Sequence, residues 1–85
     1  MTPRFAPGVR LHHDRARERW VVMAPERMFV PDEIALEVLR LVDGVRDDAA
    51  IIDELAERFA APRDVIATDV QAMLQDLTQR GALAC

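Results

Sequence analysis

The chain of 85 residues contains a single cysteine, Cys85 at its last position, which excludes an internal disulfide framework. No run of apolar residues approaches the roughly 20 that cross a membrane as a helix. The first eight residues hold two prolines and a glycine, and none of the apolar segment that marks a secretory signal. Because no signal for export or for a membrane is present, we expect a cytoplasmic protein with no membrane partner.

Lysine is absent, and all eleven cationic side chains are arginines. We attribute this bias to genomic composition rather than to function. The charge is uneven: residues 1–20 hold five arginines against two carboxylates, a net of +3, whereas residues 21–85 carry a net of −7. Apolar residues make up 51% of the chain, so residues 1–85 can build the core of one domain.

Short β-strand patterns occupy the first third of the chain. Residues 9–12 alternate apolar and polar side chains, which is typical of a half-buried strand. Residues 19–23 are aromatic and β-branched, and they predict a second strand antiparallel to the first. Residues 28–30 form a short third strand, which Pro31 must end or confine to an edge because proline has no amide hydrogen.

The next segment predicts a first helix from Asp32 to about Val42. The carboxylate of Asp32 can accept hydrogen bonds from the free amides of the first turn. Gly44 is expected as the residue after the helix, where glycine adopts a left-handed conformation readily. The residues expected to face inward are Ile34, Val38, Leu41 and Val42.

Two more helices follow. Asp47 or Asp48 caps the second, which ends near Phe59, and Pro62 with Asp64 starts the third, which Gly81 stops. The predicted fold class is therefore α+β and winged-helix-like, a three-stranded antiparallel sheet followed by a three-helix bundle. Its single domain has an extended arm at 1–8, strands at 9–30 and helices at 32–81.

Candidates for catalysis are few. His12, His13 and Asp14 are the one cluster with metal or acid–base potential, but adjacent strand residues point to opposite faces, and a metal site needs three or four convergent ligands. Cys85 has no partner base in the sequence. We therefore predict no catalytic residue, no metal site and no cofactor, and an enzyme is the least favoured class of function.

A winged-helix regulator that binds DNA is the alternative function. Its recognition helix would have to approach phosphates, and Lys and Arg provide most of that affinity. The predicted helices at 47–59 and 64–80 carry net charges of −4 and −2. These charges disfavour a nucleic-acid partner. An open edge of the third strand is compatible instead with a peptide that adds as a further strand.

Several short segments, taken in their order and spacing along the chain, are recognisable together: Gly8-Val9-Arg10-Leu11, Pro25-Glu26-Arg27-Met28, Leu41-Val42-Asp43-Gly44, Ile51-Ile52 with Leu55 and Arg58-Phe59, Asp69-Val70 with Leu74, and Gly81. Together they resemble the PqqD family of peptide chaperones in pyrroloquinoline quinone biosynthesis. The resemblance covers nearly the whole chain. Two positions depart from the family: Arg27 replaces a common glycine, and Pro31 replaces an apolar strand residue.

The resemblance implies a non-catalytic role. It implies that the chain binds the ribosomal precursor peptide PqqA and presents it to the radical SAM enzyme PqqE, which joins a Glu and a Tyr of that peptide. The peptide would lie between the third strand and the third helix, and some of the helix residues must instead face the core. The N-terminal hairpin is also a candidate for exchange between two protomers of a homodimer. The implied peptide-binding residues are Met28, Phe29, Val30, Val70, Met73, Leu74 and Leu77.

Overall fold

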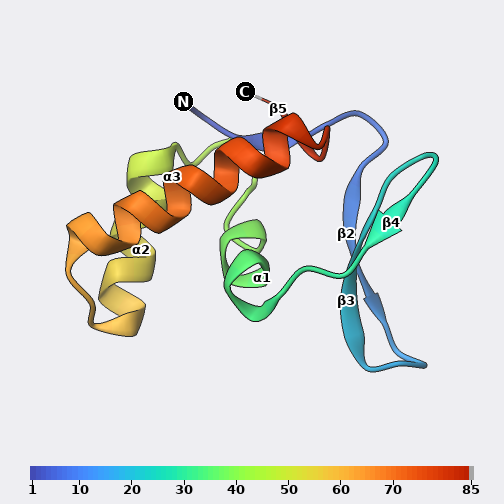
Figure 1. The fold of residues 1–85 in the computed structure, drawn as a ribbon, viewed down its shortest axis with the longest axis horizontal. Helices are drawn as coiled ribbons and strands as arrows, with labels where there is room; N and C mark the ends of the chain where they lie inside the picture. Colours follow the sequence, from blue (N-terminus) through green and yellow to red (C-terminus); the bar gives the residue numbers. More distant parts are fainter. Residues whose placement is uncertain (85) are drawn as a thin grey trace.

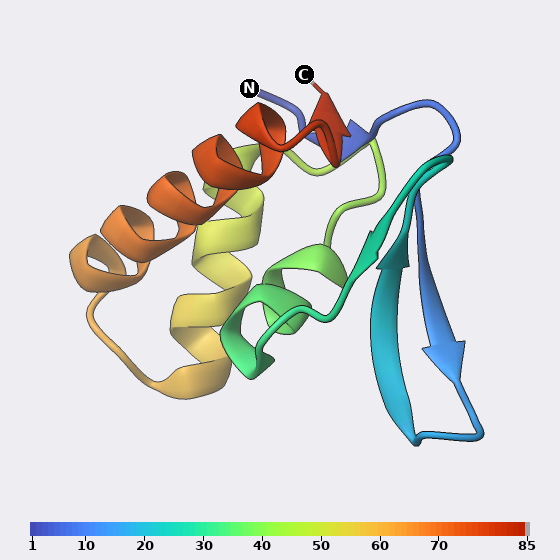
Figure 2. The ribbon, with the colours of Figure 1, turned by 45° about the vertical axis from the view of Figure 1, so that its right-hand side comes forward.

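The computed structural model describes residues 1–84 and places them in a small α+β fold, which confirms the predicted fold class (Figure 1). Within this range a three-stranded antiparallel sheet stands beside three helices, and a second sheet of two short strands joins the chain ends. Figure 2 shows the hairpin of the larger sheet extending away from the helices. Cys85, for which the sequence offers no partner base, falls outside the described residues.

The larger sheet has the order β2–β3–β4, which places β4 at an edge. Its strands are β2 (Arg10–Asp14), β3 (Arg19–Met23) and β4 (Met28–Phe29). β2 extends to Asp14, two residues beyond the prediction, and Asp14 Oδ1 then accepts hydrogen bonds from the amides of Ala16 and Arg17 in the turn. β4 ends one residue early, because Pro31 follows Val30.

The extended arm predicted for residues 1–8 is instead tied to the end of the chain. β1 (Arg4–Phe5) pairs antiparallel with β5 (Leu83–Ala84), and Pro3 is fully buried. The amide of Ala6 also donates to the Ala82 carbonyl at 3.0 Å. Two-residue strands are too short for the period-2 pattern to reveal. A homodimer by exchange of the hairpin remains a prediction. Residues 3–6 already pack within their own chain, so a shortage of intrachain contacts at the N-terminus is no argument for the exchange.

The first helix, α1 (Glu33–Leu39), begins as predicted and ends early. Asp32 caps it, with its Oδ1 accepting from the Ala35 amide at 2.7 Å. Leu41 and Val42 lie beyond the helix and are nevertheless buried in the core. The inward position predicted for Ile34 is wrong, because 64% of this residue is exposed.

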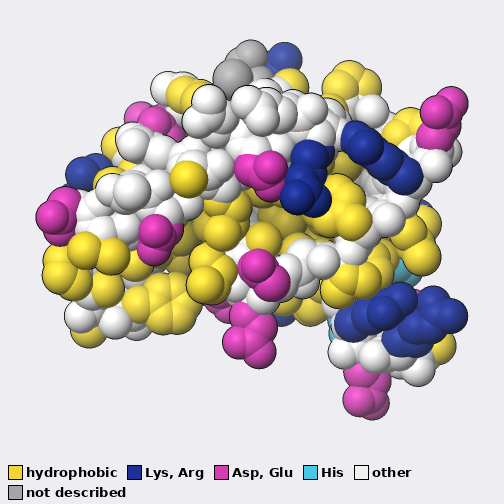
Figure 3. All heavy atoms as spheres, in the orientation of Figure 1, with side chains coloured by type: hydrophobic (Ala, Val, Ile, Leu, Met, Phe, Trp, Pro, Cys, Tyr) yellow, Lys and Arg dark blue, Asp and Glu magenta, His cyan; other side chains and the backbone are white. Residues whose placement is uncertain are grey.

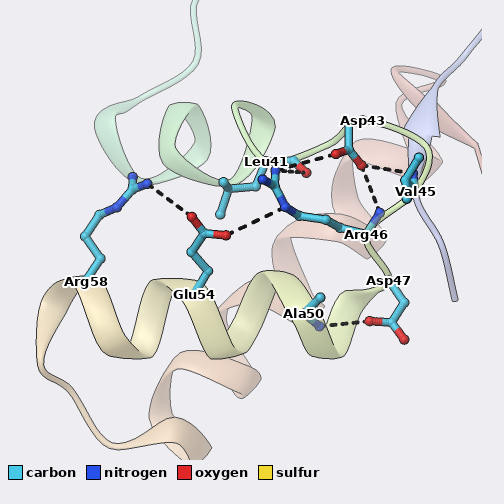
Figure 4. A network of polar contacts seen from close by, with 8 residues as sticks. All are labelled: Leu41, Asp43, Val45, Arg46, Asp47, Ala50, Glu54 and Arg58. Atoms are coloured by element: carbon cyan, nitrogen blue, oxygen red, sulfur yellow. Dashed lines mark hydrogen bonds and ion pairs between the residues drawn. The ribbon is translucent and has the colours of Figure 1, made fainter.

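Gly44 does not terminate α1 but lies in a separate turn before α2, with φ +79°. Asp43 Oδ1 accepts from the amides of Val45 and Arg46, and these two hydrogen bonds lower the pKa of the Asp43 carboxyl below its usual value. Figure 4 shows that Arg46 also approaches Glu54 on α2, which in turn approaches Arg58. The turn is therefore fastened to the second helix.

Replacing Gly44 by Ala is expected to lower the free energy of unfolding by about 1–2 kcal/mol, the cost of a left-handed conformation for a residue with a Cβ. A Cβ built at Gly44 meets Arg4 Cβ at 3.7 Å, an ordinary contact, so the loss comes from the backbone alone. Urea denaturation measures it. Gly44→Asn should lose less, because asparagine tolerates this region, and equal losses would contradict a backbone origin.

The other two helices pack against each other and contribute to the core. α2 (Asp48–Phe59) begins after Asp47, whose Oδ1 accepts from the Ala50 amide at 2.8 Å. α3 (Arg63–Gln79) begins after Pro62, without a side-chain cap. Gly81 stops it with φ +81°, as predicted. Buried side chains from all three helices meet Val22 of β3 and Leu83 of β5 in one core.

Among the helices of residues 1–84, none combines the length and the apolar composition that a membrane crossing needs.

Candidate functional site

The outer side of β4 is an open sheet edge. On its inner side β4 pairs with β3 through Val22 opposite Phe29 and Met23 opposite Met28, next to a hydrogen bond of 2.8 Å from the Ala24 amide to the Arg27 carbonyl. Amides alternate in direction along a strand, so the Phe29 amide faces β3, and those of Met28 and Val30 face outward. Within residues 1–84 no strand pairs with this outer side.

A groove of about 470 Å³ adjoins this edge, and we call it the β4–α3 groove. Phe29 and Val30 form its strand side, Ile34 lies at the start of α1, and Met73 and Leu77 come from α3. Exposed backbone donors therefore lie beside apolar side chains. This combination lets an extended chain add to a sheet and bury alternate side chains.

A second groove of about 530 Å³ continues from the first between the three helices, and we call it the α1–α2–α3 groove. Ile34, Asp69 and Met73 line both grooves and so connect them. Phe59 from α2 and Ile66 from α3 complete its apolar walls. Figure 3 shows the hydrophobic atoms as a hollowed band between α3 and α1, with carboxylates along its margins.

The residues implied as peptide-binding separate into three groups. Phe29, Val30, Met73 and Leu77 line the β4–α3 groove, and Val70 lines the α1–α2–α3 groove. Met28 and Leu74 line neither. Met28 lies on the open edge and is 55% exposed. Three of the four implied residues on α3 belong to the core, because Val70, Leu74 and Leu77 are each at most 4% exposed. Met73, the fourth, is half-buried.

Other groove residues were missed by the sequence analysis. Ile34 was assigned to the core, Asp69 was quoted only within the family resemblance and counted in the negative charge of its helix, and Asp76 was only counted in that charge. The sequence does contain a pattern that could have identified the groove residues of α3. Intervals of four, three and four residues separate Asp69, Met73, Asp76 and Arg80. This spacing places them on one face of α3, beside the apolar stripe of the core.

Charged side chains at both ends of the two grooves form ion pairs. At the strand end, Arg80 pairs with Asp76 at 3.1 Å, its guanidinium lies 5.9 Å from the centre of the Phe29 ring, and its carbonyl accepts a hydrogen bond from Arg27. At the helical end, Glu37 pairs with Arg58. Arg80, the one cation among the described residues that line the two grooves, and Arg58 beside them are thus already engaged in ion pairs.

The cluster considered for metal or acid–base chemistry, His12, His13 and Asp14, lies in β2, within the described part of the chain. No group of three His, Cys, Asp or Glu side chains converges there. His13 stacks on Trp20, with ring centroids 4.8 Å apart, and Arg40 lies 5.0 Å from the centre of the Trp20 ring. These contacts are those of a packed sheet face.

The fold is shared with recognition elements for ribosomally synthesised, post-translationally modified peptides. The structure of the PqqD portion of Methylobacterium extorquens PqqCD, described as a functional, stand-alone recognition element of this class, matches with a TM-score of 0.80 and 38% identity, over 98% of this chain and 88% of that one. Lasso peptide synthetase B1, solved with a leader peptide, has a TM-score of 0.79 over the full length of both chains at 19% identity, which speaks for the fold alone.

The sequence comparisons identify the family. The family model described as coenzyme PQQ synthesis protein D (PqqD) matches residues 19–83. A protein of Rhodopseudomonas palustris named PqqA binding protein is 58% identical over 81 residues, covering 95% of this chain and 76% of that protein. One of the same name from Gluconobacter oxydans is 52% identical over 79 residues, covering 93% and 82%. The chain belongs to the PqqD family, and it is non-catalytic, as the family is.

Proposed function

We propose that the chain is a cytoplasmic chaperone that binds the precursor peptide PqqA by strand addition and presents it to the radical SAM enzyme PqqE. The observation that carries the proposal is the outer edge of β4, which no strand of residues 1–84 covers, beside a groove with apolar side chains on both its strand and its helix side. Main-chain hydrogen bonds at such an edge supply affinity for any extended peptide, and side-chain pockets supply the choice among peptides.

The comparisons support the nature of the ligand. Relatives at 52% and 58% identity are named for binding PqqA, and the 38% identical PqqD structure is described as a functional recognition element for ribosomally synthesised peptides. A domain without catalytic groups must hand its peptide to another protein for chemistry. The resemblance to PqqD chaperones supports PqqE, a radical SAM enzyme, as that protein.

Titrating the labelled chain with PqqA is expected to shift the amide resonances of residues 28–30 and 66–77. The amides of Met28 and Val30 should also gain protection from hydrogen exchange, because they acquire partners in the added strand. The Phe29 amide, which faces β3, serves as the internal control and should change little in protection. Shifts confined to residues 12–18, in the hairpin, would contradict binding at β4.

A further inference from the structure

We propose that the α1–α2–α3 groove seats an apolar side chain of the bound peptide, and that Glu33 and Asp69 hold a neighbouring Lys or Arg of that peptide. This inference rests on the proposed function and extends it from backbone pairing to the choice of sequence. It defines the ligand as an amphipathic, basic segment that continues beyond the residues paired with β4.

The first support is unpartnered apolar surface. Ile34 and Phe59 are 64% and 53% exposed, and they stand on different helices facing a common groove. Large apolar side chains that line a concave surface are typical of binding sites, whereas scattered exposed ones need no explanation. Burying them under a peptide side chain removes this surface from water, at roughly 25 cal/mol per Å².

The second support is continuity with the strand edge. Pro31 ends β4 where α1 begins, and Ile34 and Met73 there line both grooves. A peptide laid along β4 and extended past Val30 therefore passes from one groove into the other. The residues shared by the two grooves make it possible for a single chain to occupy both.

The third support is charge. Glu33 on α1 and Asp69 on α3 line the groove, and neither has an ion-pair partner among residues 1–84. The other carboxylates nearby are engaged, Glu37 with Arg58, Asp76 with Arg80, and Asp32 as the helix cap. Two unpaired carboxylates attract a cation and repel an acidic segment. Lys and Arg also lay their aliphatic stems on apolar surface, which suits this groove.

The test measures the dissociation constant of PqqA by calorimetry for matched variants of the whole chain. Glu33→Gln with Asp69→Asn removes two charges without changing shape, and we expect binding about fivefold weaker at low salt, with the difference narrowing as salt is raised. Glu18→Gln with Glu57→Gln removes two carboxylates that lie outside both grooves and have no ion-pair partner among residues 1–84, and it should change binding less than about twofold. If both double variants weakened binding equally, the effect would come from the overall negative charge of the chain attracting the peptide. That result would overturn the role of Glu33 and Asp69.

The apolar seat has its own test in Phe59→Ala, for which we expect binding at least about tenfold weaker. Val65→Ala, an exposed apolar residue on α3 outside both grooves, is the matched control. Thermal unfolding checks that both variants fold, which we expect because Phe59 and Val65 are each about half exposed and lie outside the core. If Phe59→Ala and the charge variant bind like the wild type while Met28 and Val30 still gain protection, strand addition stands and the groove proposal falls. If the wild type does not bind PqqA, both fall together.

Discussion

Replacing Leu74 by Ala is expected to lower the free energy of unfolding by about 3 kcal/mol. Leu74 is completely buried at the centre of the core, between the helices and the sheet. Truncation loses the transfer free energy of its side chain and leaves a cavity that close-packed neighbours fill only in part. A small domain has roughly 5–15 kcal/mol of stability in total, so the loss is a large share.

Met73 is the matched control for Leu74, one residue away on the same helix. It is half-buried and lines both grooves, so Met73→Ala should cost about 1 kcal/mol of stability or less and weaken PqqA binding instead. Urea denaturation followed by circular dichroism and calorimetric titration measure the two effects. If Leu74→Ala were the milder change for stability, the assignment of Leu74 to the core rather than to peptide binding would be wrong.

Replacing both Met28 and Val30 by Pro is expected to weaken PqqA binding about a hundredfold. Each proline removes an outward amide that would donate to the added strand, and its ring also obstructs the approach of that strand. One such hydrogen bond contributes about 1 kcal/mol, and the obstruction adds to it. Calorimetric titration with PqqA measures the loss.

Alanine at the same two positions is the control for this double substitution. Met28→Ala with Val30→Ala removes the side chains and keeps both amides, so binding should fall far less than with proline. Phe29→Pro would not serve, because the Phe29 amide faces β3 and its loss would disturb the sheet itself. Equal binding by the alanine and proline pairs would show that PqqA does not add to β4 as a strand.

The sequence was most informative where the determining contact is local. Asp32 and Asp47 cap their helices because a carboxylate reaches the amide three residues ahead. Gly81 ends α3 for the equally local reason that glycine tolerates a positive φ. The three strands of the larger sheet were predictable from alternating and β-branched runs, whereas Pro31 left open whether the third strand ends there or lies at an edge, and the strand order decided it.

The errors arose where the deciding partner is distant in the chain. Residues 4–5 form a strand only because residues 83–84 lie beside them. Ile34 fits the helical period of the core, yet it faces a groove because no element covers that side of α1. Gly44 matched a helix terminus, but α1 had already ended and the glycine lies in the turn that Asp43 closes.

The amino-acid sequence by itself determined the α+β class, the N-terminal caps of α1 and α2 and the acidic helices, because each depends on residue type and on spacing within a few positions. Only the tertiary structure decided which apolar residues of α3 are core and which are surface. Met73 and Leu74 are adjacent, and the stripe on α3 is wide enough to include both. The positions of α1, α2 and β4 around α3 decide that Leu74 is covered and that Met73 is not. The grooves between those elements leave Met73, Ile34 and Phe59 accessible to a peptide.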